Sequence, residues 1–154
     1  MAVEHLSSAI TESLLNLVYP LLLAQPRVGK SAVVACIAGD RHQIGARMVA
    51  DFFELKGWRS HFCGANTPLD TVQSLVEDKR PNVLALSITL EGGMETLENA
   101  ARELRKAFSD LPILVGGQGL KTGAAEALMS ASGVRYLGSL SALEAWIDKE
   151  SRND

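Results

Sequence analysis

Two short apolar runs limit most strongly how this chain can fold. They read VVACIA at positions 33–38 and VLALSI at positions 83–88. A strand with one face in water alternates apolar and polar residues, whereas a strand covered on both faces is apolar almost throughout. The two runs therefore predict central strands of a parallel sheet that has helices on both sides.

Between the apolar runs lie longer segments whose apolar residues recur every three or four positions, as in amphipathic helices. The expected strands are 32–38, 60–64, 82–88, 113–116 and 135–137. The expected helices after them are 45–56, 68–78, 94–108, 122–130 and 141–149. This alternation predicts an α/β, flavodoxin-like (Rossmann-like) fold, a five-stranded parallel sheet in the order 2-1-3-4-5 with helices on both faces.

One further helix is expected before the first strand, at 6–23, with Ser7 or Ser8 as its cap and Pro20 stopping or kinking its last turn. Its apolar stripe needs a partner surface. Packing on the domain is the first expectation, and contact with an upstream helical domain or another protomer of a homo-oligomer is the alternative. Residues 1–29 thus form a helix and linker, 30–150 the α/β domain, and 151–154 a polar, fraying tail.

Length and composition exclude several classes of protein. A chain of 154 residues with 47% hydrophobic residues is expected to form one globular domain, and a net charge of -3 gives no electrostatic basis for direct binding of nucleic acid. Two cysteines are too few for a disulfide framework, and Cys36 lies within an apolar run as a small buried residue. With neither a signal peptide nor an apolar run near the length of a membrane span, we expect a cytoplasmic protein without membrane contact.

Polar residues and glycines stand where three of the expected strands end. They are Asp40, Arg41 and His42 after the first strand, Ser87 and Thr89 at the third, and Gly116 and Gly117 at the fourth. An open parallel sheet binds ligands at the carboxyl ends of its strands, in the crevice where the strand order reverses. We therefore expect these residues to line one binding site.

The residue types indicate a metal-linked ligand. A neutral imidazole is a common metal ligand, and an acid close by can accept its other ring N–H and fix its orientation. Asp40 and His42 have this spacing, but His5 and His61 are too far away in the sequence to complete a zinc site. A metal bound here should therefore arrive already held by an organic ring.

These positions together resemble the cobalamin-binding domain family over residues 30 to 150. The family pattern is Asp-x-His-x-x-Gly, then Ser-x-Leu, then Gly-Gly at successive strand ends. This sequence has Asp40-Arg41-His42-Gln43-Ile44-Gly45, then Ser87-Ile88-Thr89, then Gly116-Gly117. The one departure is Thr89, which stands where leucine is usual.

The resemblance implies a role for each residue towards adenosylcobalamin or methylcobalamin. His42 replaces the cofactor's benzimidazole as the lower axial ligand of cobalt, and Asp40 hydrogen-bonds His42. Gly45 leaves room at the start of the first helix, and Ser87 hydrogen-bonds the buried base. Gly116 and Gly117 line the channel for the nucleotide tail, while Arg41 and Gln43 flank the ligand and face solvent.

A second, weaker resemblance concerns the pair Glu4-His5. B12-dependent light-sensing regulators carry a helical bundle before the cobalamin domain, with a tryptophan and a Glu-His pair that help to cap the upper corrin face. The resemblance implies that residues 1–29 are the end of such a bundle; a solvated N-terminus is the alternative.

Other ligands are less compatible with the sequence. Residues 24–31 match a relaxed phosphate-loop pattern, but a strand is expected after them where the phosphate loop requires a helix. No Gly-x-Gly-x-x-Gly follows the first strand, and the third strand ends without the aspartate of a phospho-receiver domain.

Three uses of a cobalamin site remain open. One is a sensory or regulatory module, working with a DNA-binding partner. Another is a corrinoid carrier that works with a methyltransferase. The last is the cobalamin-binding part of an isomerase. No independent catalysis is expected, and a structural protein without cofactor would leave the Asp40–His42 pair unexplained.

Overall fold

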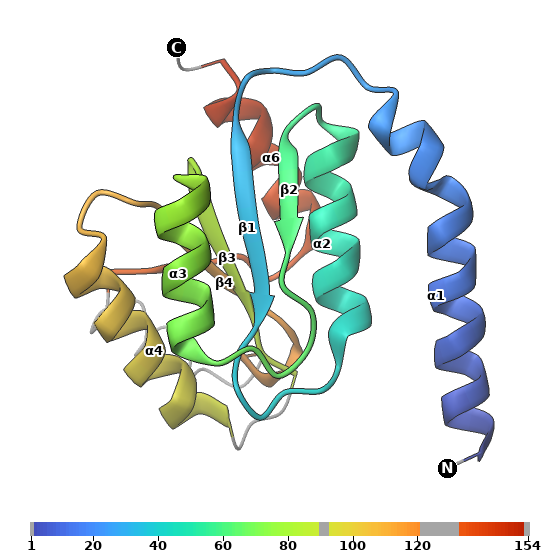
Figure 1. The fold of residues 1–154 in the computed structure, drawn as a ribbon, viewed down its shortest axis with the longest axis horizontal. Coiled ribbons are helices and arrows are strands. Elements are labelled where there is room, and N and C mark those ends of the chain that lie inside the picture. The colour runs from blue at the N-terminus through green and yellow to red at the C-terminus, as the bar shows by residue number, and fades with distance from the viewer. Residues whose placement is uncertain (1, 90–92, 121–132, 153–154) are drawn as a thin grey trace.

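The fold is organised around a parallel sheet in the order β2-β1-β3-β4-β5, seen in a computed structural model (Figure 1). The structure describes residues 2–89, 93–120 and 133–152. The strands are β1 (Ser31–Cys36), β2 (Arg59–Phe62), β3 (Val83–Ser87), β4 (Ile113–Gly116) and β5 (Arg135–Tyr136). The predicted flavodoxin-like topology is confirmed.

Helices cover both faces of the sheet, as predicted. Helices α2 (Gln43–Leu55) and α6 (Leu140–Glu150) pack on one face, and α3 (Leu69–Lys79) and α4 (Met94–Ala107) on the other. A short 3-10 helix, η2 (Gln118–Leu120), follows β4. The helix predicted at 122–130 lies outside the described residues.

Alternate side chains of each central strand enter two separate cores. In β1, Val33 and Ala35 join the cluster under α3 and α4, whereas Val34 joins the cluster under α2 and α6. The second cluster contains Trp58 and Trp146, whose ring centroids lie 6.0 Å apart. Both tryptophans are buried in this core.

Among the element boundaries that differ from the prediction, two lie around the loop after β1. Helix α2 begins at Gln43 rather than at residue 45, because the loop after β1 turns at once, with the Gln43 N–H donating to the Arg41 carbonyl at 3.2 Å. Strand β1 ends at Cys36, since Ile37 makes only an isolated bridge to Thr67.

The C-terminal tail is also better held than predicted. Trp58 Nε1 donates to the Ser151 hydroxyl at 2.8 Å, so Ser151 is anchored to the core rather than frayed.

Helix α1 (Ala2–Leu23) is longer than predicted. Because it begins at Ala2, Ser7 and Ser8 lie inside it and neither caps it. The helix also continues through Pro20 for three more residues, so Pro20 does not stop it before Leu23.

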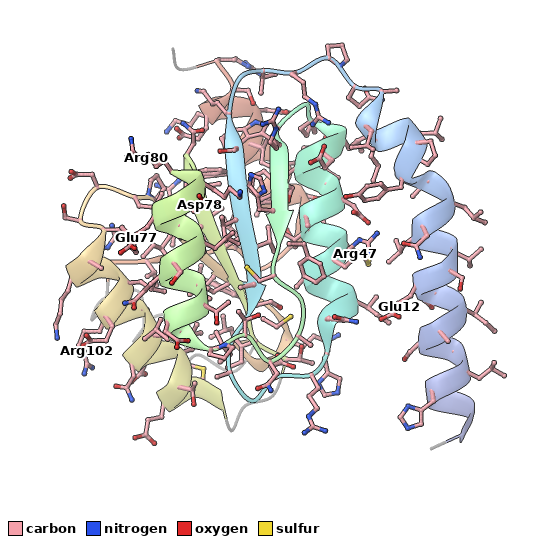
Figure 2. The ribbon with its side chains drawn as sticks, viewed as in Figure 1. Glu12, Arg47, Glu77, Asp78, Arg80 and Arg102 are labelled. Atoms are coloured by element: carbon pink, nitrogen blue, oxygen red, sulfur yellow. The ribbon has the colours of Figure 1, made fainter. Side chains whose placement is uncertain are left out.

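The apolar stripe of α1 points away from the domain, so the expectation that it packs there is wrong. Leu6, Leu14, Leu17 and Leu21 are 61%, 58%, 74% and 67% exposed. The opposite face meets α2 through polar groups, which Figure 2 shows between the two helices. The alternative expectation, that an upstream helical domain or another protomer covers the stripe, is the one compatible with this exposure.

The same helix corrects the expectation about membrane spans. Among the described residues, His5–Leu23 is 19 residues long and satisfies the length and composition of a bilayer-crossing helix, by those two criteria alone. The apolar run was missed because serines, threonine and asparagine interrupt it, although Glu12 is its single acidic residue and it has no Lys or Arg.

The linker after α1 is tied to the domain. Arg27 forms an ion pair with Glu54 and donates to the Trp58 carbonyl at 2.8 Å. The Val28 N–H donates to the Gly57 carbonyl at 3.0 Å. These bonds fix the point at which α1 leaves the domain.

A small polar cavity of about 230 Å³ lies where α1, α2 and β2 meet. One oxygen of the buried Asp51 accepts a bond from Arg47 Nε at 3.2 Å, and Oδ2 has no hydrogen-bond partner among the described residues. Burial raises the pKa of Asp51 above its usual value, although the bond from Arg47 acts in the opposite direction.

We expect Asp51→Asn to change how stability depends on pH. A carboxyl whose pKa is raised by folding stabilises the protein at low pH, and this contribution is lost as pH rises through the raised pKa. As pH rises from the usual pKa of an aspartate to the raised pKa of Asp51, the free energy of unfolding of the native protein should therefore fall. The free energy of unfolding of the variant should show no such fall. Urea denaturation across acidic to neutral buffers measures this; parallel profiles for the two proteins would contradict it.

Candidate functional site

The carboxyl ends of β1, β3 and β4 meet at one edge of the sheet, where a cavity of about 470 Å³ opens. Every residue predicted for the site except Asp40 lines this cavity. The lining includes Arg41, His42, Gln43, Ile44, Gly45, Ser87, Thr89, Gly116 and Gly117. The residues predicted from the strand ends and those added by the family resemblance therefore lie together at one cavity.

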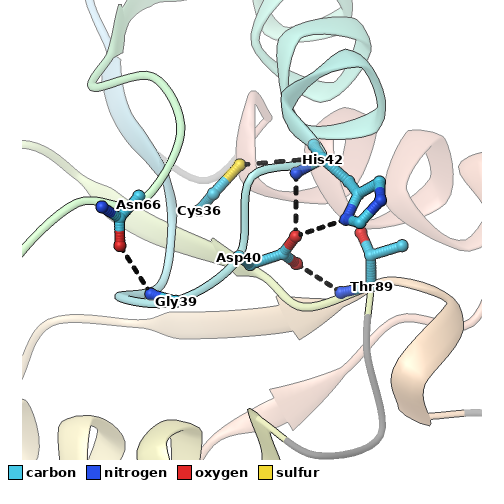
Figure 3. Close-up of polar contacts among 6 residues, drawn as sticks. All are labelled: Cys36, Gly39, Asp40, His42, Asn66 and Thr89. Atoms are coloured by element: carbon cyan, nitrogen blue, oxygen red, sulfur yellow. Dashed lines mark hydrogen bonds and ion pairs between the residues drawn. The ribbon is translucent and has the colours of Figure 1, made fainter. Parts of the chain in front are cut away.

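Asp40 lies behind the cavity wall and connects two of its loops (Figure 3). Its Oδ1 accepts the backbone N–H of His42 at 2.9 Å and lies 3.1 Å from His42 Nδ1. Its Oδ2 accepts the backbone N–H of Thr89. One buried carboxylate therefore orients the loop after β1 and ties it to the loop after β3.

These bonds keep Asp40 ionised and fix the tautomer of His42. Burial alone would raise the pKa of Asp40, but the hydrogen bonds from His42 and Thr89 outweigh it and lower the pKa. Beside an ionised carboxylate Nδ1 is the donor, so Nε2 keeps the lone pair that can bind a metal. The His42 side chain is 53% exposed, whereas that of Asp40 is 3% exposed.

The described residues contain no group of three His, Cys, Asp or Glu side chains able to hold a metal ion. The donor set at this edge is thus a single oriented imidazole. It suits a metal that a ring already holds.

Asn66 is a site residue that the sequence reasoning missed. The backbone N–H of Asn66 donates to the backbone carbonyl of Asp40 at 2.7 Å, and its side-chain oxygen accepts the backbone N–H of Gly39 at 2.7 Å. It adopts a positive φ of 50°, which asparagine tolerates well. Because the predicted strand order places β2 next to β1, the loops after these two strands lie side by side. The strand order was therefore the feature that could have pointed to a contact between Asn66 and the Asp40 loop.

Gln43 corrects a second expectation. Arg41 is exposed, as predicted, but Gln43 is half-buried, and its Nε2 donates to Glu12 Oε1 of α1 at 2.9 Å. Ser8 and Glu12 also line the cavity. The sequence does not predict them, because residues 1–29 are expected to lie outside the α/β domain. The four-residue spacing of Ser8 and Glu12, which places both on one face of the helix, is the available signal.

The three glycines of the motifs differ in what requires them. At Gly117, with a φ of 116°, an added Cβ would lie 2.0 Å from the Ile88 carbonyl oxygen, so the fold itself demands glycine. At Gly116 the added Cβ would lie 3.1 Å from the Leu137 carbonyl oxygen. At Gly45 nothing lies within 4 Å, so packing within the chain gives no reason for a glycine in this helix.

A family model for the B12 binding domain matches residues 30–143. The chain belongs to this family. The match covers the strand ends described above and leaves α1 outside. Family membership makes the chain a cobalamin-binding domain, as the resemblance of its motifs implied.

Known proteins with similar sequences or folds include a regulator and corrinoid proteins. The HTH-type transcriptional repressor CarA of Myxococcus xanthus is 34% identical over 121 residues, which are 79% of this chain and 42% of CarA. This chain therefore spans less than half the length of that relative.

Two solved structures share the fold. A cobalamin-binding protein from Desulfitobacterium hafniense matches with a TM-score of 0.67 and 20% identity, over 79% of this chain and 58% of that one. The methanol:cobalamin methyltransferase complex MtaBC of Methanosarcina barkeri matches with a TM-score of 0.68 and 19% identity, over 81% of this chain and 49% of that one.

We expect Gly45→Ala to separate stability from cofactor binding. Alanine inside a helix is more stable than glycine by about 1 kcal/mol, and here it meets no clash. The variant should therefore unfold at higher urea concentration and yet bind hydroxocobalamin more weakly, because its methyl group enters the cavity. Unchanged affinity, measured by absorption titration, would remove Gly45 from the site.

Gly117→Ala is the matched comparison. Its clash with the Ile88 backbone should lower stability, so any loss of binding there would follow from misfolding.

Proposed function

We propose that this domain is a regulatory cobalamin-binding module in which His42 takes the place of the cofactor's own base on the cobalt. One observation carries the proposal: a buried, ionised Asp40 holds His42 Nδ1 at 3.1 Å and leaves Nε2 free on a half-exposed side chain beside the cavity. When bound, the cofactor supplies the cobalt–carbon chemistry.

The remaining cavity residues suit the displaced nucleotide tail. The cavity continues from His42 between the sheet and helices α2 and α6, with Ala46, Ala85 and Leu143 in its lining. The small side chains of Ala46 and Ala85 leave space for a flat ring on that path, and the Ser87 hydroxyl can hydrogen-bond the base. We assign Gly116 to the wall of this channel and Gly117 to the fold that shapes it.

A regulatory use is supported by the relative and by the N-terminal helix. CarA is named a transcriptional repressor, and it is the relative with 34% identity. We propose that α1 is the end of a helical bundle whose other helices cover the exposed apolar stripe. His5, exposed on α1, and Glu4 would then lie near the upper corrin face.

A corrinoid carrier in methyl transfer is the second candidate. The His42 side chain is 53% exposed, so a partner methyltransferase could approach the cobalt held above it.

The ligand assignment predicts the spectrum of the His42→Ala variant. Native protein mixed with hydroxocobalamin should give the absorption spectrum of a histidine-ligated, base-off corrinoid, and His42→Ala should lose it while keeping its circular dichroism. His61→Ala is the control, since His61 lies on β2 and is not among the residues lining the cavity. A native-like spectrum in His42→Ala would refute the assignment.

Illumination distinguishes the two uses. If the module is a light-responsive regulator, protein loaded with adenosylcobalamin should change its oligomeric state when the cobalt–carbon bond is cleaved by light. Size-exclusion chromatography before and after illumination measures this. An unchanged elution volume, together with methylation of the reduced cobalt by a methyltransferase, would favour the carrier.

A further inference from the structure

Helix α1 supplies part of the cavity wall although it lies outside the family match. Ser8 and Glu12 line the cavity together with His42 and Gln43. In Figure 1 α1 lies beside α2, and its N-terminal half is at the end of the domain towards which β1 and β2 point. A cofactor seated on His42 would therefore meet α1 at one edge.

Polar contacts hold α1 in this place. Arg47, one turn after Gln43 on α2, donates to Asn16 Oδ1 at 3.1 Å and lies 5.3 Å from the centroid of the Tyr19 ring. In Figure 2 the Glu12 side chain points from α1 towards α2, and the Arg47 side chain points from α2 towards α1. The hydrogen-bond partners of Arg47 are Asn16 and Asp51, and its ion pair is with Asp51.

Glu12 thus brings to the cavity a carboxylate that forms no ion pair with any residue the structure describes. Its Oε1 accepts the bond from Gln43 at 2.9 Å, and no other polar partner is found for Glu12 in the part of the chain that the structure describes. The carboxylate is half-buried and keeps unused acceptor capacity. It can accept N–H groups from a ligand and repels ligand carboxylates.

This charge matters for corrinoids because their edges differ. The corrin of cobalamin and cobinamide carries primary amides around its rim, whereas cobyrinic acid carries carboxylates at the same positions. An amide N–H can bond a carboxylate such as Glu12, and the hydroxyl of Ser8 can bond either group. A rim carboxylate against Glu12 would leave two like charges in contact.

We propose that Glu12 is a specificity-determining residue that selects amidated corrinoids over carboxylated ones. The inference rests on the proposed function, because it places the corrin on His42. The inference adds that α1 distinguishes amide from carboxylate groups on the corrin rim.

The test compares the affinities of cobinamide and cobyrinic acid, which both lack the nucleotide tail. Native protein should bind cobinamide more tightly. Glu12→Gln keeps an oxygen that can accept from Gln43 and removes the charge, so the affinity ratio should fall by about tenfold. Glu12→Lys should shift the ratio further, towards cobyrinic acid. Glu77→Gln, on the exposed face of α3, is the control that should leave the affinity ratio unchanged.

Each outcome has one meaning. If Glu12→Gln keeps the native ratio while the native protein still binds hydroxocobalamin with histidine ligation, Glu12 does not select the rim and the proposed function stands. If the native protein binds no corrinoid, the proposed function itself fails. Should Glu12→Lys fail to fold by circular dichroism, the ratio for Glu12→Gln alone decides.

Discussion

The site depends on one buried carboxylate. Asp40 collects hydrogen bonds from the backbone and ring of His42 and from the backbone of Thr89, so two loops share a single acceptor group. Asn66 holds the same turn from the β2 side. His42 is left as an exposed imidazole on a rigid, buried support, which is how proteins orient metal-binding histidines.

Much of this arrangement follows from the sequence because the sheet is parallel. Strand β4 has the predicted bounds, and the residues at the ends of three strands gather at one cavity since parallel strands all end at the same edge. Asn66 and Glu12 escaped prediction because their roles arise from neighbours distant in the chain. Periodicity identified the apolar stripe of α1 but could not show which face of the helix meets the domain.

Helix α1 therefore turns polar groups towards the domain and most of its leucines towards the outside, although Leu22 near its end is buried. Hydrogen bonds between groups that water can also satisfy add little net free energy, so the polar face alone holds the helix weakly. A consequence follows by thermodynamic reciprocity. A protein that binds the exposed leucines and separates α1 from α2 would remove part of the cavity wall. Its binding would therefore lower the affinity of the cavity for its ligand. By the same reciprocity, ligand bound in the cavity would lower the affinity of that protein for α1 by the same factor.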